Sequence, residues 1–377
     1  MEWLRKYLKK IKSNGRPFIA FQIEPTSRCQ LKCTMCPRTT FFNEWESGDM
    51  PLSMYQKISE YFDRVENIHL QGWGEPLLSP DIFEMIHMAK TKHCSVSLTT
   101  NGVNVTPDIS KRLIQEGLDT IAISIAGATK ETHERIRCGS NFEQLVENIK
   151  GLSDLKARTK SKKPKIVISF LMTKINYEEL PDIVHLSKDM RVNELVATNL
   201  DYSPTTSLDE LRLFSCNMTN GGFKKIVEMA VKEAKKNKMP FRVYPLEMED
   251  AVMCEMNPLR IVFLSHDGCV SPCVYLNMTK RGLLQRVFCG SSSEIQKVCF
   301  GNVREHDFMD IWEKSDYQDF RNTYRARLNA VGNMYGNIGF DMTSMETLKQ
   351  TEKAIEEALK KNPVPEACRT CYKAYGI

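Results

Sequence analysis

The 377-residue sequence contains no long hydrophobic run. No apolar stretch approaches the roughly 18 residues that suggest a membrane-spanning helix, so we predict no membrane span. Charged residues recur through the N-terminal segment, which argues against a secretory signal. The sequence also has no internal repeat and no low-complexity tract. The net charge is only +5, and basic residues do not interleave with aromatic ones, so nucleic acid is not an expected partner.

Cysteine, in contrast, is plentiful, with 13 residues in the chain. Without a secretion signal, this number indicates a reducing compartment, which we take to be the cytoplasm, and metal binding in preference to disulfides. Three cysteines stand at Cys-x3-Cys-x2-Cys spacing directly after an apolar run over residues 18–23, namely Cys29, Cys33 and Cys36. Thiolates this close in sequence can converge on one soft metal centre, as in iron–sulfur clusters.

The odd number of these cysteines is itself informative. Three ligands leave one iron of a four-iron cluster without a protein ligand, and an open position is typical of a reactive metal centre. A zinc knuckle, disulfides or buried thiols are the alternatives. The cysteine-only, odd-numbered set after the first strand argues against all three.

Short apolar runs alternate with longer amphipathic stretches over the first two thirds of the chain. We expect strands near 18–24, 66–71, 95–100, 119–125, 165–172 and 193–199. Helices are expected at 52–64, 80–91, 106–116, 141–157, 177–189 and 221–237. Repeated strand–helix alternation predicts an α/β fold with a parallel sheet and crossover helices.

The second predicted strand runs into a glycine-rich turn, Gly72-Trp73-Gly74-Glu75-Pro76. Glycine lets a ligand approach the backbone closely, and a nearby carboxylate can accept hydrogen bonds from a ligand ammonium group. An ordinary strand-to-helix turn is the alternative.

The cysteine triplet and this turn together resemble the signature of the radical S-adenosylmethionine (SAM) enzymes. Met35 stands where the family usually has an aromatic residue, Trp73 replaces the first of two paired glycines, and Ala126 stands where aspartate is common. The resemblance implies a partial (β/α)6 TIM-like barrel. It also implies a [4Fe-4S] cluster whose open iron is chelated by SAM, and reductive cleavage of SAM to a 5'-deoxyadenosyl radical.

The resemblance also suggests which residues bind SAM. Gly74 and Glu75 are assigned to the methionine amino group, and Ser124 to a ribose or carboxylate oxygen. Arg137 can form a two-pronged pair with the methionine carboxylate, although a solvated arginine is the alternative. Met172 is expected to face the adenine or else to pack in the core. Asn199, at the end of the sixth strand, is a weaker polar candidate.

A second group of cysteines lies near the C-terminus. Four thiolates with the spacing to close a second cluster are Cys254, Cys273, Cys368 and Cys371. The pattern resembles the SPASM/twitch extension of radical SAM enzymes, in a short version with one auxiliary [4Fe-4S] cluster. Zinc on the same thiolates is the alternative. Cys269 is a substitute ligand, and Cys289 and Cys299 either replace a ligand or together help to hold an extra site. Buried thiols are expected for Cys94, Cys138 and Cys216.

These features predict a basic helix within residues 1–16, a radical SAM barrel over 17–240 and a small α+β cluster-binding domain over 247–377. The last contains an insertion at about 325–365 with a helix over about 344–361. The expected activity is radical oxidation or maturation of a small-molecule alcohol or of a peptide or protein side chain. The auxiliary cluster would accept an electron, and an external donor such as ferredoxin or flavodoxin would supply the first one.

The residue that removes a proton from the substrate is left open. The candidates for this base are Tyr55, His69, His93, His266 and Arg260, with none preferred. The rival interpretations are a non-enzymatic zinc or iron–sulfur scaffold for a protein partner and, less different, a radical SAM methyltransferase or methylthiotransferase.

Overall fold

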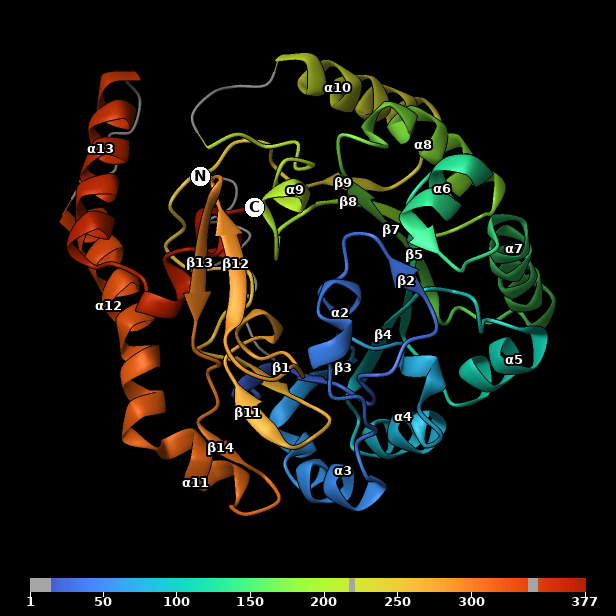
Figure 1. Ribbon diagram of the computed structural model, residues 1–377, viewed down its shortest axis with the longest axis horizontal. Helices are drawn as coiled ribbons and strands as arrows, with labels where there is room; N and C mark the ends of the chain where they lie inside the picture. The colour runs from blue at the N-terminus through green and yellow to red at the C-terminus, as the bar shows by residue number, and fades with distance from the viewer. Residues whose placement is uncertain (1–14, 217–220, 338–344) are drawn as a thin grey trace.

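The computed structural model describes residues 15–216, 221–337 and 345–377, so the predicted N-terminal helix lies outside the described residues. Six parallel strands form the centre of the fold, in the spatial order β1-β3-β4-β5-β7-β8 (Figure 1). They are β1 (Phe18–Ile23), β3 (Val65–Leu70), β4 (Ser95–Thr100), β5 (Thr120–Ile125), β7 (Lys165–Met172) and β8 (Glu194–Asn199). All six lie where the sequence predicts strands, and they confirm the partial barrel.

Helices cover the outer face of these strands (Figure 1). The longer ones are α3 (Leu52–Ser59), α4 (Ile82–Thr91), α5 (Pro107–Gln115), α7 (Phe142–Thr159), α8 (Leu180–Asp189) and α10 (Gly221–Lys236). Side-chain caps fix several starts: Thr106 accepts from the Ile109 N–H, and Asn141 accepts from the Gln144 N–H. The core between strands and helices is apolar, and Ile121, for example, is fully buried.

Several short elements close to the strand ends have no clear signal in the sequence. They are the helices α2 (Pro37–Thr40), α6 (Lys130–Ile136) and α9 (Thr206–Asp209) and the two-residue strands β2 (Lys32–Cys33) and β6 (Arg137–Cys138). β2 and β6 pair antiparallel, with Cys33 opposite Arg137. This pairing ties the cysteine loop to the segment after β5.

The sheet continues beyond the six strands at both edges. β9 (Phe241–Val243) adds parallel to β8, and β10 (Ile261–Leu264) adds parallel to β1. β11 (Cys269–Ser271) and β14 (Gly301–Asn302) then follow antiparallel, which gives a ten-stranded sheet. Residues from the C-terminal third of the chain therefore extend the same sheet that forms the barrel.

The rest of the C-terminal region lies beside the edge formed by β10, β11 and β14. It contains the hairpin β12 (Leu284–Phe288) and β13 (Ser291–Ile295) and the helices α11 (Phe308–Glu313), α12 (Ser315–Asn337) and α13 (Met345–Lys361). α13 confirms the predicted helix over 344–361, and it lies alongside α12 (Figure 1). α12 begins at Ser315, ten residues before the predicted insertion. Its start was not predicted because its amphipathic pattern is weak. Among the described residues, no helix is long and apolar enough to cross a membrane.

Candidate functional site

The three cysteines of the triplet lie in the loop that follows β1, at the carboxyl end of the parallel strands. Cys33 belongs to β2, and Cys36 directly precedes α2. All three thiols are free, and together they line one cavity of about 280 Å³. The predicted convergence of Cys29, Cys33 and Cys36 is therefore present in the structure.

The electrostatics of the triplet fit a metal cluster. Burial and, after it, the charge of the neighbouring Cys33 thiol raise the pKa of Cys36 to about 11. Burial likewise raises the pKa of Cys29. Thiolates crowded together in a partly buried site need a positive centre to offset their charge, and a metal cluster provides one. Arg38, on α2, supplies part of the offset, because its charge lowers the pKa of both Cys29 and Cys36.

The glycine-rich turn after β3 forms the second wall of this cavity. The Glu75 side chain is buried and accepts hydrogen bonds from the Thr100 hydroxyl (2.7 Å), the Asn101 N–H (2.7 Å) and the Leu77 N–H (3.1 Å). Burial raises the pKa of this carboxyl, and the three donors act against that rise. The Thr-Asn-Gly segment at the end of β4 therefore fixes the carboxylate beside the cysteines. Gly74 must lack a side chain, because a Cβ would overlap the carbonyl oxygen of Thr26.

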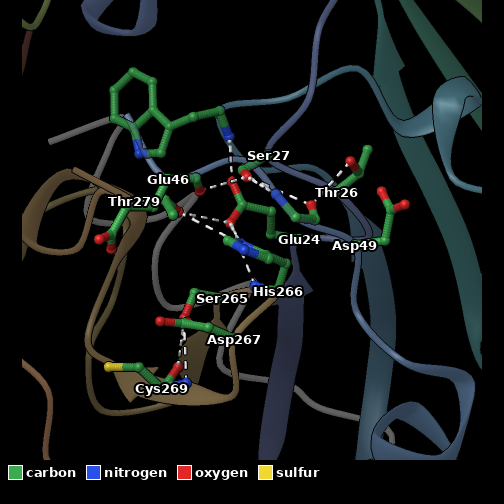
Figure 2. A network of polar contacts seen from close by, with 12 residues as sticks. Glu24, Thr26, Ser27, Glu46, Asp49, Ser265, His266, Asp267, Cys269 and Thr279 are labelled. Carbon is green, nitrogen blue, oxygen red and sulfur yellow. Dashed lines mark hydrogen bonds and ion pairs between the residues drawn. The ribbon is translucent and has the colours of Figure 1, made fainter. Parts of the chain in front are cut away.

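A second buried carboxylate, that of Glu24, contacts the glycine-rich turn (Figure 2). Glu24 follows β1 and accepts a hydrogen bond from the Trp73 N–H at 2.7 Å. Its other oxygen lies 3.1 Å from the His266 ring nitrogen Nδ1 and 3.4 Å from the Thr279 hydroxyl (Figure 2). A Cβ on Gly72 would overlap Glu24. This network joins the glycine-rich turn to the C-terminal region.

Two of the predicted SAM-binding residues also line the cavity, namely Ser124 and Arg137. The Arg137 nitrogen Nη1 lies 3.9 Å from the Cys33 sulfur, and its Nε is buried without a partner among the described residues. A guanidinium N–H that is buried and unpaired fits an anionic ligand group in the cavity. Arg137 therefore lies at the cavity, and its role in binding a carboxylate stays a prediction.

The structure does not bring Met172 or Asn199 to the cavity wall. Met172 is fully buried in the core of the barrel, and Leu171 lines the cavity instead. Neighbouring strand residues point to opposite faces, so only one of these two can face the ligand. The Asn199 amide donates to the Pro245 carbonyl at 2.7 Å, and its side chain is buried outside the cavity.

None of the five candidates for the base lines this cavity either. His266 belongs to the Glu24 network, the Tyr55 hydroxyl donates to the Met85 carbonyl, and the His69 ring contacts Ser97 and Gln71. Arg260 binds the carbonyl groups of residues 16 and 17. His93 lies in the tight turn that precedes β4.

Another part of the cavity wall is formed by side chains for which the sequence predicted no role. Three aromatic rings, Trp73, Tyr202 and Tyr275, lie with centroids 5.9–6.5 Å apart. Beside them, the Asp201 carboxylate accepts from the Tyr275 hydroxyl (2.9 Å) and pairs with the Lys373 ammonium (2.8 Å). Asp201 follows the last residue of β8 by two positions, and this place at a strand end is the signal that identifies it.

The four C-terminal cysteines form the second candidate centre. Burial raises the pKa of Cys254 to about 11 and also raises the pKa of Cys273 and Cys368, and in each of the three the Cys371 charge adds to the rise. Cys254, Cys273 and Cys368 also pack in one apolar cluster with Tyr324. Across residues 15–216, 221–337 and 345–377, no three His, Cys, Asp or Glu side chains are placed to hold a metal ion as they stand. A four-iron cluster differs from a single ion in giving each thiolate an iron of its own.

Two disulfides correct the predictions for the remaining cysteines. Cys269 is bonded to Cys299, and Cys216 is bonded to Cys289. The pairing of β11 with β14 brings the first pair together, since Cys269 lies in β11 and Cys299 precedes β14. Cys269, Cys289 and Cys299 are thus not available as substitute ligands, and the prediction of a simple buried thiol was wrong for Cys216.

The other two cysteines outside the clusters are both free. Cys94 is buried, as predicted, whereas Cys138 is partly exposed because it lies in the short strand β6 at the surface of the cysteine loop. The prediction of a buried thiol is therefore confirmed for Cys94 and wrong for Cys138.

Two family models match the chain. The model described as the radical SAM superfamily matches residues 23–187, and the SPASM model, described as an iron–sulfur cluster-binding domain, matches residues 254–372. The first covers the cysteine triplet and the glycine-rich turn. The second covers all four C-terminal cysteines.

The proteins similar in sequence have different named roles. The tungsten-containing aldehyde ferredoxin oxidoreductase cofactor-modifying protein of Pyrococcus furiosus is 28% identical over 306 residues, which cover 79% of this chain and 82% of that protein. The mycofactocin maturase MftC of Mycobacterium ulcerans is 28% identical over 170 residues, 44% of this chain and 42% of its own.

Solved structures share the fold. The crystal structure of Streptococcus suis SuiB bound to S-adenosylmethionine matches with a TM-score of 0.61 at 17% identity, over 85% of this chain and 72% of that one. This likeness confirms the fold class, a partial barrel followed by a smaller C-terminal domain.

Proposed function

Because this chain belongs to the radical SAM superfamily and carries a SPASM-type iron–sulfur domain, we propose that it cleaves SAM reductively and abstracts a hydrogen atom from a side chain of a peptide substrate. Its cofactors are [4Fe-4S] clusters, one of them auxiliary, and SAM. The observation that carries the proposal is the shared cavity: three free thiols face the fixed carboxylate of Glu75 across one small space.

We assign the first cluster to Cys29, Cys33 and Cys36. The cluster and SAM supply the radical chemistry when bound, and the protein orients them and excludes water. The Gly74 backbone and the Glu75 carboxylate bind the methionine ammonium group of SAM. Arg137 binds the methionine carboxylate, and Ser124 donates to an oxygen of the same ligand. Leu171, and not Met172, lies beside the adenine in this proposal.

We assign the auxiliary cluster to Cys254, Cys273, Cys368 and Cys371. Tyr275 and Lys373 each lie two positions after one of these cysteines, and both contact Asp201 at the cavity. The segments that hold the auxiliary cluster therefore also build the substrate wall. In this proposal Asp201 accepts a hydrogen bond from the substrate, the auxiliary cluster takes the electron released on oxidation, and a ferredoxin or flavodoxin reduces the first cluster.

A peptide is the preferred substrate because one similar protein is known with a bound precursor peptide and another is named as a maturase. SuiB has been crystallised with its precursor peptide SuiA, and MftC is named as a maturase. A cofactor precursor, including a small-molecule alcohol, is the second candidate. It is favoured by the cofactor-modifying protein of Pyrococcus furiosus, which matches most of the chain.

Anaerobic reconstitution with iron and sulfide, followed by reduction in the presence of SAM, tests this function. We expect about eight irons per chain and release of 5'-deoxyadenosine. Changing all three triplet cysteines to alanine should abolish cleavage and remove half of the iron, whereas Cys94→Ala, a matched change of a free thiol outside both sites, should alter neither. Cleavage that survives the triple change, or bound zinc without cleavage, would refute the proposal.

A further inference from the structure

A large groove lies outside the cavity described above, next to β9. Its volume is about 690 Å³. One wall is formed by α10 and the end of β9, and the other by the extended segment 246–251 and the C-terminal turn near Tyr375. Apolar side chains contribute most of the surface, among them Val227, Val243, Leu246 and Met253.

The strand beside this groove is the last of the ten-stranded sheet. Its inner edge bonds to β8, through Leu195 N–H to the Pro240 carbonyl and Tyr244 N–H to the Ala197 carbonyl, both at 2.9 Å. The backbone groups of Phe241 and Val243 point to the other side, and within the described part of the chain no strand pairs with that edge. An open edge of this kind is a template for an added strand.

The charge of the groove is opposite to that of the whole chain. Its lining contains one lysine and five carboxylates, whereas the chain carries a net charge of +5. Three of the carboxylates have cationic partners: Glu247 with Lys224, Asp250 with Arg327, and Glu255 with Lys373.

The remaining two carboxylates stand on opposite walls, Glu228 on α10 and Glu249 on the facing segment, and both residues are exposed. An apolar groove with exposed carboxylates on both walls is complementary to a ligand that is apolar and cationic.

One side chain, Lys373, contacts a lining residue of the groove and a lining residue of the SAM cavity. The ammonium group of Lys373 lies 3.4 Å from Glu255, in the wall of the groove, and 2.8 Å from Asp201, in the wall of the cavity. A chain seated in the groove would therefore lie next to the proposed reaction site.

We propose that this groove binds an extended segment of the peptide substrate, rich in lysine or arginine and in apolar residues, which adds to the outer edge of β9 as a strand. Binding there holds the peptide while a neighbouring residue enters the cavity. The inference rests on the proposed function, in that it takes the substrate to be a peptide.

Fluorescence anisotropy with the full-length protein tests this directly. The probes are two fluorescein-labelled ten-residue peptides, one of alternating Val and Lys and one of alternating Val and Glu. We expect the Val–Lys peptide to bind at least tenfold more tightly than the Val–Glu peptide. The double change Glu228→Lys and Glu249→Lys should weaken its binding at least tenfold. The matched control, Glu84→Lys with Glu147→Lys on α4 and α7, should leave binding unchanged.

A second pair of variants tests the strand edge. Val243→Pro removes an outward N–H from the edge of β9, and Val243→Ala removes a comparable part of the side chain while keeping that N–H. We expect the proline variant to bind the Val–Lys peptide several-fold more weakly than the alanine variant, with circular dichroism confirming that both are folded. Equal binding by the two variants, or no effect of the charge reversal, would overturn the proposal.

Anisotropy also tells a bound substrate segment from an occupant supplied by the chain itself. If deletion of residues 1–14 tightens probe binding tenfold, the occupant of the groove is the chain's own basic N-terminus and the proposal is wrong. Probe binding needs neither cluster nor SAM, so it can succeed when 5'-deoxyadenosine release fails. Release of 5'-deoxyadenosine can likewise succeed when probe binding fails. The failure of the groove and the failure of the proposed function are therefore distinguishable.

Discussion

The buried Glu24 carboxylate offers the sharpest test of how the two halves of the site are held together. It is fully buried and receives four contacts, from the Trp73 N–H (2.7 Å), the His266 ring (3.1 Å), the His266 N–H (3.3 Å) and the Thr279 hydroxyl (3.4 Å). Glu24→Ala would leave these groups without an acceptor in a site that water cannot easily enter.

Breaking one partner of a buried, charged contact typically costs about 3–5 kcal/mol, so we expect a loss of that size in the free energy of unfolding of Glu24→Ala. Glu24→Gln keeps the shape and one acceptor oxygen, and should lose about 1–2 kcal/mol. With an unfolding entropy of about 2 cal/mol/K per residue, the alanine variant should melt roughly 5 °C lower.

Urea denaturation without added reductant, which keeps both disulfides intact, measures these losses. A double-mutant cycle with His266→Ala measures the coupling energy between Glu24 and His266. We expect a coupling energy of about 1–3 kcal/mol between the two positions. As a control, Glu84→Ala on the exposed face of α4 should change stability by less than about 0.5 kcal/mol. A loss below about 1 kcal/mol for Glu24→Ala, or additive effects in the cycle, would show that the network does not hold the glycine-rich turn.

Three further predictions concern single positions. Gly74→Ala should abolish SAM binding in equilibrium dialysis of the reconstituted protein, because its Cβ would overlap the Thr26 carbonyl; unchanged binding would contradict the proposed position of SAM. Arg38→Gln should shift the midpoint potential of the first cluster to more negative values in an EPR titration, whereas Arg38→Lys should shift it less, because a cation near thiolates favours the reduced form. Burial lowers the pKa of His133 to about 3, so its neutral form contributes stability above pH 6.5 that is lost as the pH falls towards 3, by up to about 1.4 kcal/mol per pH unit. In urea titrations His133→Asn should show a shallower loss over that range, and an identical slope would exclude this origin.

The sequence predicts those parts of the protein whose signals are local. The cysteine triplet, the glycine-rich turn and the six strands each occupy one continuous segment, and the structure places them as expected. The choice between Leu171 and Met172 depends on the phase of one strand, which an almost wholly apolar segment does not reveal.

Contacts between residues far apart in the sequence could not be predicted. Asp201 and Lys373 are 172 positions apart, and nothing near either residue in the sequence indicates that they meet. The disulfide between Cys269 and Cys299 likewise depends on how β11 pairs with β14. Compositional reasoning from cysteine number predicted metal binding in place of disulfides, and the chain contains free thiols at both candidate centres together with two disulfides.

The pairing of β1 with β10 has a consequence for how the protein is made. β1 carries the cysteine loop at its end, but one of its two edges is filled only by Ile261–Leu264, more than 230 residues later. A nascent chain emerging from the ribosome therefore exposes the open edge of β1 while the next strands are synthesised, and such edges are prone to wrong pairing. Ribosome-bound chains that stop before residue 261 should be the forms of this protein that most need a chaperone.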